Sequence, residues 1–147
     1  MTTHADHDLP RGGPEPADRA SALSPAEERL LFLDRLHPES PRYSVPVRYR
    51  FHGTLDADAL HDALQDLVTR HEALRTYVTA DDRRLTTRTA TLPWSVLDLS
   101  AAEPAVAAAR ARRHLATLAL CPVSTDTAPL ARACLVREPG DRWTARM

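Results

Sequence analysis

The chain has 147 residues, a length typical of one domain, and its 19 basic and 20 acidic residues give a formal net charge of −1. This balance argues against a nucleic-acid-binding protein, which would carry a basic excess. No apolar run approaches the ~20 residues of a membrane span, and the polar N-terminus shows no secretory signal. Cys121 and Cys134 stand outside any metal-ligand spacing, which argues against a disulfide framework or a zinc site. We therefore expect a cytoplasmic protein.

The first 21 residues contain prolines, glycines and charged residues with almost nothing apolar to bury. Such a composition predicts a flexible leader over residues 1–21, so we expect the ordered domain to cover residues 22–147. His4 and His7 could hold a metal weakly. A solvated tail is the better interpretation, because no other ligands stand nearby in the sequence.

The first helix is predicted to begin at Ser24 and to end at His37, before a proline. Ser24 and Glu27 have the spacing of a capping box, in which each side chain accepts a hydrogen bond from the other residue's backbone N–H. Pro25 falls at the first helical position, where its missing N–H costs nothing. These signals place the start of the helix within a residue or two.

The segment 45–52 alternates strictly between apolar and polar residues, which predicts a strand with one buried face. The residues of that face are Val45, Val47, Tyr49 and Phe51. Asp56 is a good N-cap for the next helix, which we expect to end near His71. Its apolar stripe consists of Leu60, Leu64, Leu67 and Val68.

The second half of the chain predicts a hairpin, an extended segment, a helix and two further strands. The hairpin joins 74–79 to 83–89, and the extended segment covers 94–99. Ser100 and Glu103 have capping-box spacing before an Ala-rich helix over 105–119. Residues 130–137 and 143–147 are the last strands, joined by a turn at Pro139–Asp141. This order of helices and strands predicts a mixed α/β layer.

Several segments resemble motifs of the condensation domains of nonribosomal peptide synthetases. Ser24–Leu33 is similar to S-x-A-Q-x-R-L-W-x-L, with Glu27 for Gln and Leu31 for Trp. Arg70–Thr76 matches R-H-E-x-L-R-T at every fixed position, and Pro129–Ala133 resembles P-L-L-R-A. The resemblance covers roughly residues 22 to 140. It implies the mixed-sheet half of a chloramphenicol-acetyltransferase-like lobe, incomplete in this chain.

The resemblance also implies an activity. Family members join aminoacyl or peptidyl thioesters by an amide bond, and both thioesters are carried on the phosphopantetheine arms of carrier proteins. The family site centres on HHxxxDG, but none of the seven histidines of this chain has a histidine neighbour. We therefore expect a truncated condensation domain that is inactive alone and contains no catalytic residue of the family. The resemblance also implies a role in secondary-metabolite biosynthesis, with carrier proteins or other synthetase modules as partners. It implies no cofactor or metal bound by the chain itself.

The family motifs supply the candidate site residues, which we expect to be structural. They are Ser24, Arg29, Arg70, His71, Glu72, Arg75 and Thr76. In the family an arginine of the second motif pairs with the aspartate of HHxxxDG, so Arg75 is expected to be a buried or half-buried cation without its partner. Such a charge costs on the order of several kcal/mol. His71 is expected to act at a helix end rather than as a general base.

Two other interpretations remain open. The chain can be a non-catalytic module that docks a carrier protein or a synthetase subunit, with Arg110, Arg112 and Arg113 as a small basic patch. It can also be a gene product shortened by a frameshift or stop. A nucleophilic role for Cys121 or Cys134 has little support, because no Asp–His pair stands in a recognisable arrangement.

Overall fold

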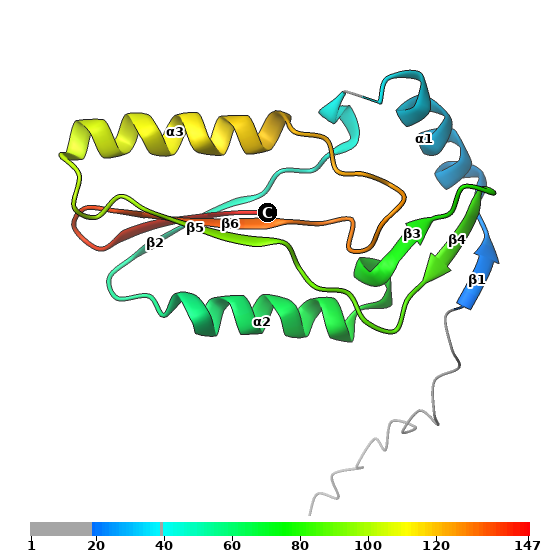
Figure 1. Cartoon of the computed structure of the whole chain (residues 1–147), viewed down its shortest axis with the longest axis horizontal. Coiled ribbons are helices and arrows are strands. Elements are labelled where there is room, and N and C mark those ends of the chain that lie inside the picture. The colour runs from blue at the N-terminus through cyan, green and yellow to red at the C-terminus, as the bar shows by residue number, and fades with distance from the viewer. Residues whose placement is uncertain (1–18, 39) are drawn as a thin grey trace, which may run out of the picture.

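The computed structural model of the chain describes residues 19–38 and 40–147, which form two sheets and three α-helices (Figure 1). The larger sheet has the strand order β2-β7-β6-β5, from Arg48–His52, Arg142–Arg146, Ala133–Glu138 and Trp94–Asp98. The smaller sheet has the order β1-β4-β3, from Arg19–Ala22, Arg83–Thr86 and Thr76–Val78. The helices are α1 (Pro25–Leu36), α2 (Ala57–Arg70) and α3 (Pro104–Leu120), with short 3-10 turns at Pro41–Tyr43 and Glu72–Arg75. The predicted mixed α/β class is confirmed.

The larger sheet lies between α2 and α3, and its residues alternate between the two helices (Figure 1). On one face, Cys134 and Val136 of β6 pack against Ala111 and Leu115 of α3. On the other face, Leu135 packs with Trp143 and, from the side of α2, with Leu60. Leu135 and Val136 are both fully buried, so β6 is covered on both faces. This explains its continuous apolar run.

The strand order follows from the connections. The chain leaves β5, passes through α3 and returns as β6, which runs parallel to β5. Parallel neighbours require a crossover of this kind. The tight turn after β6, with Gly140 at φ 75° and Asp141 at φ 50°, brings β7 back antiparallel to β6. As a result β7 lies inside the sheet, between β6 and β2.

The smaller sheet and α1 form a second layer at one end of the molecule (Figure 1). Ion pairs join α1 to β4 and to the turn before it. Arg84 bonds Glu27 at 3.3 Å, and the Arg35 guanidinium makes two hydrogen bonds to the Asp82 carboxylate. The capping box predicted for this helix is confirmed, because Ser24 and Glu27 each accept from the other's backbone N–H.

The predicted boundary between the leader and the domain is wrong. Residues Arg19–Ala22, three of which fall in the predicted leader, form β1 and pair with β4. The side chain of Arg19 also bonds Glu72 at 3.0 Å. A strand of four residues with polar and small side chains carries little pattern in sequence, since its partner strand provides the hydrogen bonds. The rest of the leader, with His4 and His7, lies outside the described residues.

Two further predictions need correction. The N-cap of α3 is Glu103, whose carboxylate accepts from the N–H groups of Ala105 and Val106, so the capping box expected from Ser100 does not form. Strand β2 begins only at Arg48, and the face expected to be buried is largely open. Val45 is 83% exposed and Tyr49 54% exposed, while Phe51 alone of that face joins the core.

Replacement of Leu135 by Ala tests the central position of β6. We expect the free energy of unfolding to fall by about 3 kcal/mol, because the change leaves a cavity between the sheet and α2. Leu120→Ala is the matched control, since Leu120 is 67% exposed, and should change the free energy by less than about 0.5 kcal/mol. Urea melts of the two variants measure both values. Equal losses would contradict this account of the core.

Candidate functional site

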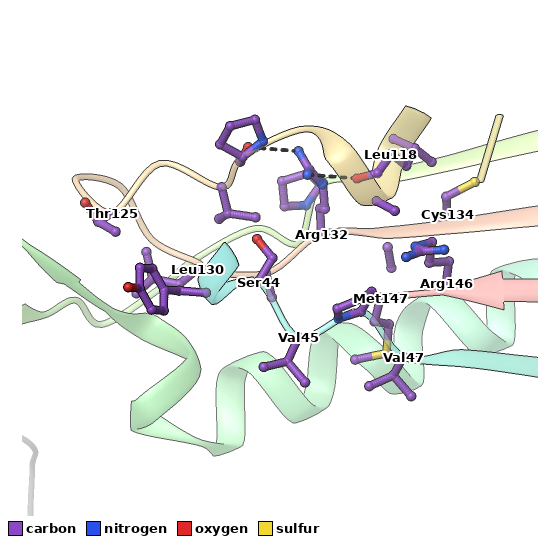
Figure 2. A pocket seen from close by; sticks show the side chains of 18 of the residues that line it. Ser44, Val45, Val47, Leu118, Thr125, Leu130, Arg132, Cys134, Arg146 and Met147 are labelled. Atoms are coloured by element: carbon purple, nitrogen blue, oxygen red, sulfur yellow. Dashed lines mark hydrogen bonds between the residues drawn. The ribbon is translucent and has the colours of Figure 1, made fainter. Parts of the chain in front are cut away.

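A groove of about 570 Å³ opens at one end of the larger sheet (Figure 2). The strand ends that meet there are the starts of β2, β5 and β6 and the end of β7, because β7 runs antiparallel to β2 and β6. The C-terminal end of α3 and the loop after it form another side. The lining is mainly apolar, with Val45, Val47, Leu118, Leu130 and Met147 among its side chains.

The floor of the groove is fixed by backbone pairing. Val47 and Met147 exchange both of their N–H to carbonyl hydrogen bonds, at 2.9 and 3.0 Å. On the opposite side, the carbonyl of Thr125 accepts from the N–H of Val78 at 2.8 Å, which ties the loop to the smaller sheet. No described residue of the smaller sheet lines the groove, and the second layer contributes Asp34 of α1 to the lining.

Arg132 holds the end of α3 in place and does not present a free charge to the groove (Figure 2). Its guanidinium donates to the carbonyls of Leu118 at 3.0 Å and Pro122 at 3.3 Å, and also to that of Cys121. The last carbonyls of a helix have no partners within it, so an arginine is a suitable cap. The P-L-L-R-A-like segment thus supplies an apolar side chain of the wall, Leu130, and also Arg132, which holds the end of α3 beside the groove.

The two cysteines do not provide a nucleophile. Cys134 lines the groove but is only 2% exposed, and burial raises the pKa of its thiol, so the group is protonated at neutral pH. Cys121 is exposed and is not among the groove residues. Among the described residues no group of three or more His, Cys, Asp or Glu side chains is placed to hold a metal ion.

The seven candidate site residues lie outside the groove, and of the three quoted motifs only the P-L-L-R-A-like segment lines it. Ser24 caps α1, Arg29 is exposed on the same helix, and Arg70 is exposed at the end of α2. His71 caps α2 through its backbone N–H, which donates to Leu67, and its side chain is exposed. The structure thus distributes these residues around the junctions between helices and the smaller sheet.

The second motif connects α2 to β3. The Glu72 carboxylate bonds Arg19 of β1, and the Thr76 hydroxyl donates to the Glu72 carbonyl at 2.8 Å. Thr76 also shares a 3.0 Å hydrogen bond with Thr86 of β4. The Glu72 side chain therefore joins the motif to β1, while its carbonyl is bonded by Thr76 of β3. These bonds give the motif a structural role in the arrangement of the described residues.

Arg75 is buried, as expected, but it does not lack partners. It is 5% exposed, and its guanidinium donates to the carbonyls of Thr69 at 3.1 Å and Arg88 at 3.2 Å, and to that of Thr87. Carbonyl oxygens replace part of the hydration that a buried cation loses. No carboxylate of the described residues pairs with it. The expected cost of an unpartnered charge is therefore reduced by these bonds.

The family model of the Condensation domain matches residues 18–147. The chain belongs to the condensation-domain family. It is 40% identical over 118 residues to a linear gramicidin synthase of Brevibacillus parabrevis, over 78% of this chain and 2% of that protein. It is 36% identical over 135 residues to the phosphinothricin tripeptide synthetase PhsC of Streptomyces viridochromogenes, over 85% of this chain and 12% of that protein.

Solved condensation domains share the fold. A double mutant of the starter condensation domain of the rhizomide synthetase RzmA superposes with a TM-score of 0.74 at 25% identity, over 87% of this chain and 31% of that one. The condensation domain of the monacolin K polyketide synthase MokA superposes with a TM-score of 0.72 at 17% identity, over 89% of this chain and 30% of that one. This condensation-domain chain thus spans about a third of the solved domains it matches. None of its described helices is long and apolar enough to cross a membrane.

The capping box supports a pH prediction. Hydrogen bonding to the side chain and backbone of Ser24, with Arg84 nearby, lowers the pKa of the Glu27 carboxyl below its ordinary 4.5. A lowered folded-state pKa gives stability that is present above about 4.5 and is lost as the pH falls through the folded-state value. Ser24→Ala should therefore move the Glu27 midpoint upward toward 4.5 and lower stability by about 1 kcal/mol at pH 7.

An NMR titration of the Glu27 carboxyl measures the midpoint. Ser40→Ala is the control, because Ser40 makes no side-chain cap bond, and it should leave the midpoint unchanged. A Ser24→Ala midpoint equal to that of the wild type would refute the assignment.

Arg75→Met tests the buried cation. We expect a loss of about 2–4 kcal/mol of unfolding free energy, because the carbonyls of Thr69, Thr87 and Arg88 lose a charged donor while the methionine keeps much of the volume. Arg70→Met, at an exposed position, should change it by less than about 0.5 kcal/mol. Denaturant melts compare the two variants. An unchanged unfolding free energy for Arg75→Met would show that the bonds to these carbonyls do not stabilise the fold.

Proposed function

We propose that this chain serves in nonribosomal peptide biosynthesis as the front part of a condensation domain. In this proposal the complete domain forms an amide bond between aminoacyl or peptidyl thioesters, and each thioester arrives on the phosphopantetheine arm of a carrier protein. Membership of the condensation-domain family over residues 18–147 is the observation that carries the proposal. The names of the relatives, which are peptide synthetases, agree with it.

The chemistry of the groove supports the proposal. Its volume of about 570 Å³ lies in the range of small-molecule sites, roughly 300–1,000 Å³. Apolar side chains such as Val47, Leu130 and Met147 suit an aminoacyl side chain or the uncharged parts of a pantetheine arm. Burial of apolar surface contributes about 25 cal/mol per Å². The hydroxyls of Ser44 and Thr125 lie among these residues and can bond amide groups (Figure 2).

Among the described residues the groove contains no histidine, and the carboxylate among its lining residues is that of Asp34 on α1. The Cys134 thiol stays protonated, and the Arg132 guanidinium is engaged by carbonyls of the α3 end. The sequence contains no adjacent histidines. We therefore expect residues 1–147 to supply binding walls and to form no amide bond by themselves, so that catalysis requires polypeptide carrying the HHxxxDG motif.

A second candidate is a non-catalytic module that docks a carrier protein or another protein of the synthetase. The observation that favours it is the exposure of Arg110, Arg112 and Arg113 on α3, none of which makes an ion pair with a described residue. A basic helix surface suits an acidic partner. The activity of a complete domain that contains these residues distinguishes the two candidates.

The test is a chimera in which residues 18–147 replace the matching part of an active condensation domain of a gramicidin synthase. Carrier proteins loaded with donor and acceptor amino acids are mixed with the chimera, and dipeptide is measured by mass spectrometry. We expect product from the chimera and none above a no-protein control from the 147-residue chain. Dipeptide from the chain alone would contradict the assignment of catalysis to HHxxxDG.

Leu130→Arg in the chimera tests the groove. We expect the rate to fall by about tenfold or more, because a charge in the apolar wall opposes substrate. Leu120→Arg is the matched control, since Leu120 is exposed and is not among the groove residues, and its rate should stay within about twofold. An inactive chimera that folds would favour the docking module, and equal rates for the two variants would exclude the groove as the substrate site.

A further inference from the structure

Strand β2 lies at the edge of the larger sheet and pairs with β7 alone among the described strands. The residues that exchange hydrogen bonds with β7 alternate along it, beginning with the Val47–Met147 pair and reaching the bond from Gly53 to Asp141. In an antiparallel pair the intervening residues direct their N–H and C=O groups to the other side. Arg48, Arg50 and His52 therefore offer their peptide groups outward, where a further strand would bond them.

The side chains of β2 are sorted between its two faces. Phe51 packs on the side of α2, so Val47 and Tyr49 share that side, and they are 38% and 54% exposed. Alternation places Arg48, Arg50 and His52 on the side of α3, and all three are exposed. The edge thus offers cations on one face and apolar groups on the other.

The basic face contains one pair of arginines directly opposite each other. Arg48 is the register partner of Arg146 on β7, and His52 is the partner of Arg142. Like charges opposite each other in a sheet are destabilising. None of these arginines makes an ion pair with a carboxylate of the described residues, although Glu138 stands across from Arg142 in the β6–β7 register. An anionic neighbour would relieve the repulsion.

We propose that the outer edge of β2 binds an extended polypeptide segment in which acidic residues alternate with apolar ones. The segment adds a strand to the sheet through the outward peptide groups of Arg48 and Arg50. Its carboxylates face the guanidinium groups of Arg48 and Arg50, and its apolar side chains cover Val47 and Tyr49. Addition of a strand of this kind combines main-chain affinity with specificity from alternate side chains.

The charges select this occupant over others. A second copy of the chain, paired through its own β2, would bring Arg48 and Arg50 against the same cations, so the edge opposes self-association. A nucleic acid would satisfy the cations but has no peptide groups to continue the sheet and no apolar side chains for Tyr49. The formal net charge of −1 also gives no general attraction for polyanions.

Fluorescence anisotropy with the full 147-residue chain tests the proposal. The probe is a labelled peptide of about nine residues in which Glu alternates with Val and Thr, a length that covers a strand of this size. We expect saturable binding that weakens with added salt. The same peptide with every Glu replaced by Lys, or with the amides that face β2 N-methylated, should bind about tenfold more weakly or worse. These comparisons leave the protein unchanged, so they do not depend on the folding of a variant.

Variants of the chain locate the site. R48E combined with R50E should weaken binding of the acidic peptide by about tenfold or more and should bind the Lys peptide better than the wild type does. R29E with R70E is the matched control, because it changes the net charge equally at exposed positions of α1 and α2, and its affinity should stay within about twofold.

Four results would overturn the proposal. They are no binding of the acidic peptide, equal binding of the Lys or N-methylated peptides, equal loss in the R29E and R70E control, and single-stranded DNA that competes as well as the peptide does. The last would identify a general polyanion surface.

Discussion

The burial of β6 on both faces is the constraint on which the rest of the structure depends. Leu135 and Val136 are adjacent in sequence and point to opposite helices, so neither α2 nor α3 can leave without exposing one of them. Adjacent residues of a strand face opposite sides, which makes β6 the shared element of the two halves of the core. The small residues Ala107 and Ala111 let α3 approach the sheet closely. The central position of β6 therefore decides where the ends of the neighbouring strands and of the two helices lie.

Because β6 holds both α2 and α3 on the larger sheet, the open positions lie where strands begin and end. The groove occupies the end at which β2, β5 and β6 start, and the Arg132 clamp holds the α3 terminus beside it. Loops at such an end can vary without disturbing the core, which is why binding residues gather there. The condensation-domain family motifs divide accordingly: Arg70–Thr76 joins the smaller sheet to α2, and Leu130–Ala133 lines the groove.

The sequence predicted the elements better than it predicted their surroundings. Local signals were sufficient for α1 and α2, whose caps Ser24 and Asp56 act within three residues of themselves. The alternation at 45–52 predicted the strand β2 but not its exposure, because cover for Val45 and Tyr49 has to come from other elements. Strand β1 and the acceptors of Arg75 were missed for a related reason. Their hydrogen bonds join distant segments, and the backbone carbonyls of Thr87 and Arg88 carry no residue signal.

The groove and the basic edge are not independent surfaces. Val47 lines the groove and also belongs to the apolar side of the β2 edge, while Arg146 lines the groove and faces Arg48 across the β2–β7 pair. The Val47–Met147 hydrogen bonds connect the two places through two adjacent backbones. A strand bound along β2 would therefore restrict the side chains that form one wall of the groove. By reciprocity, a ligand in the groove that orders Val47 and Arg146 would favour the added strand by the same factor. The edge and the groove are thus linked through Val47, in the segment before β2, and Arg146 of β7.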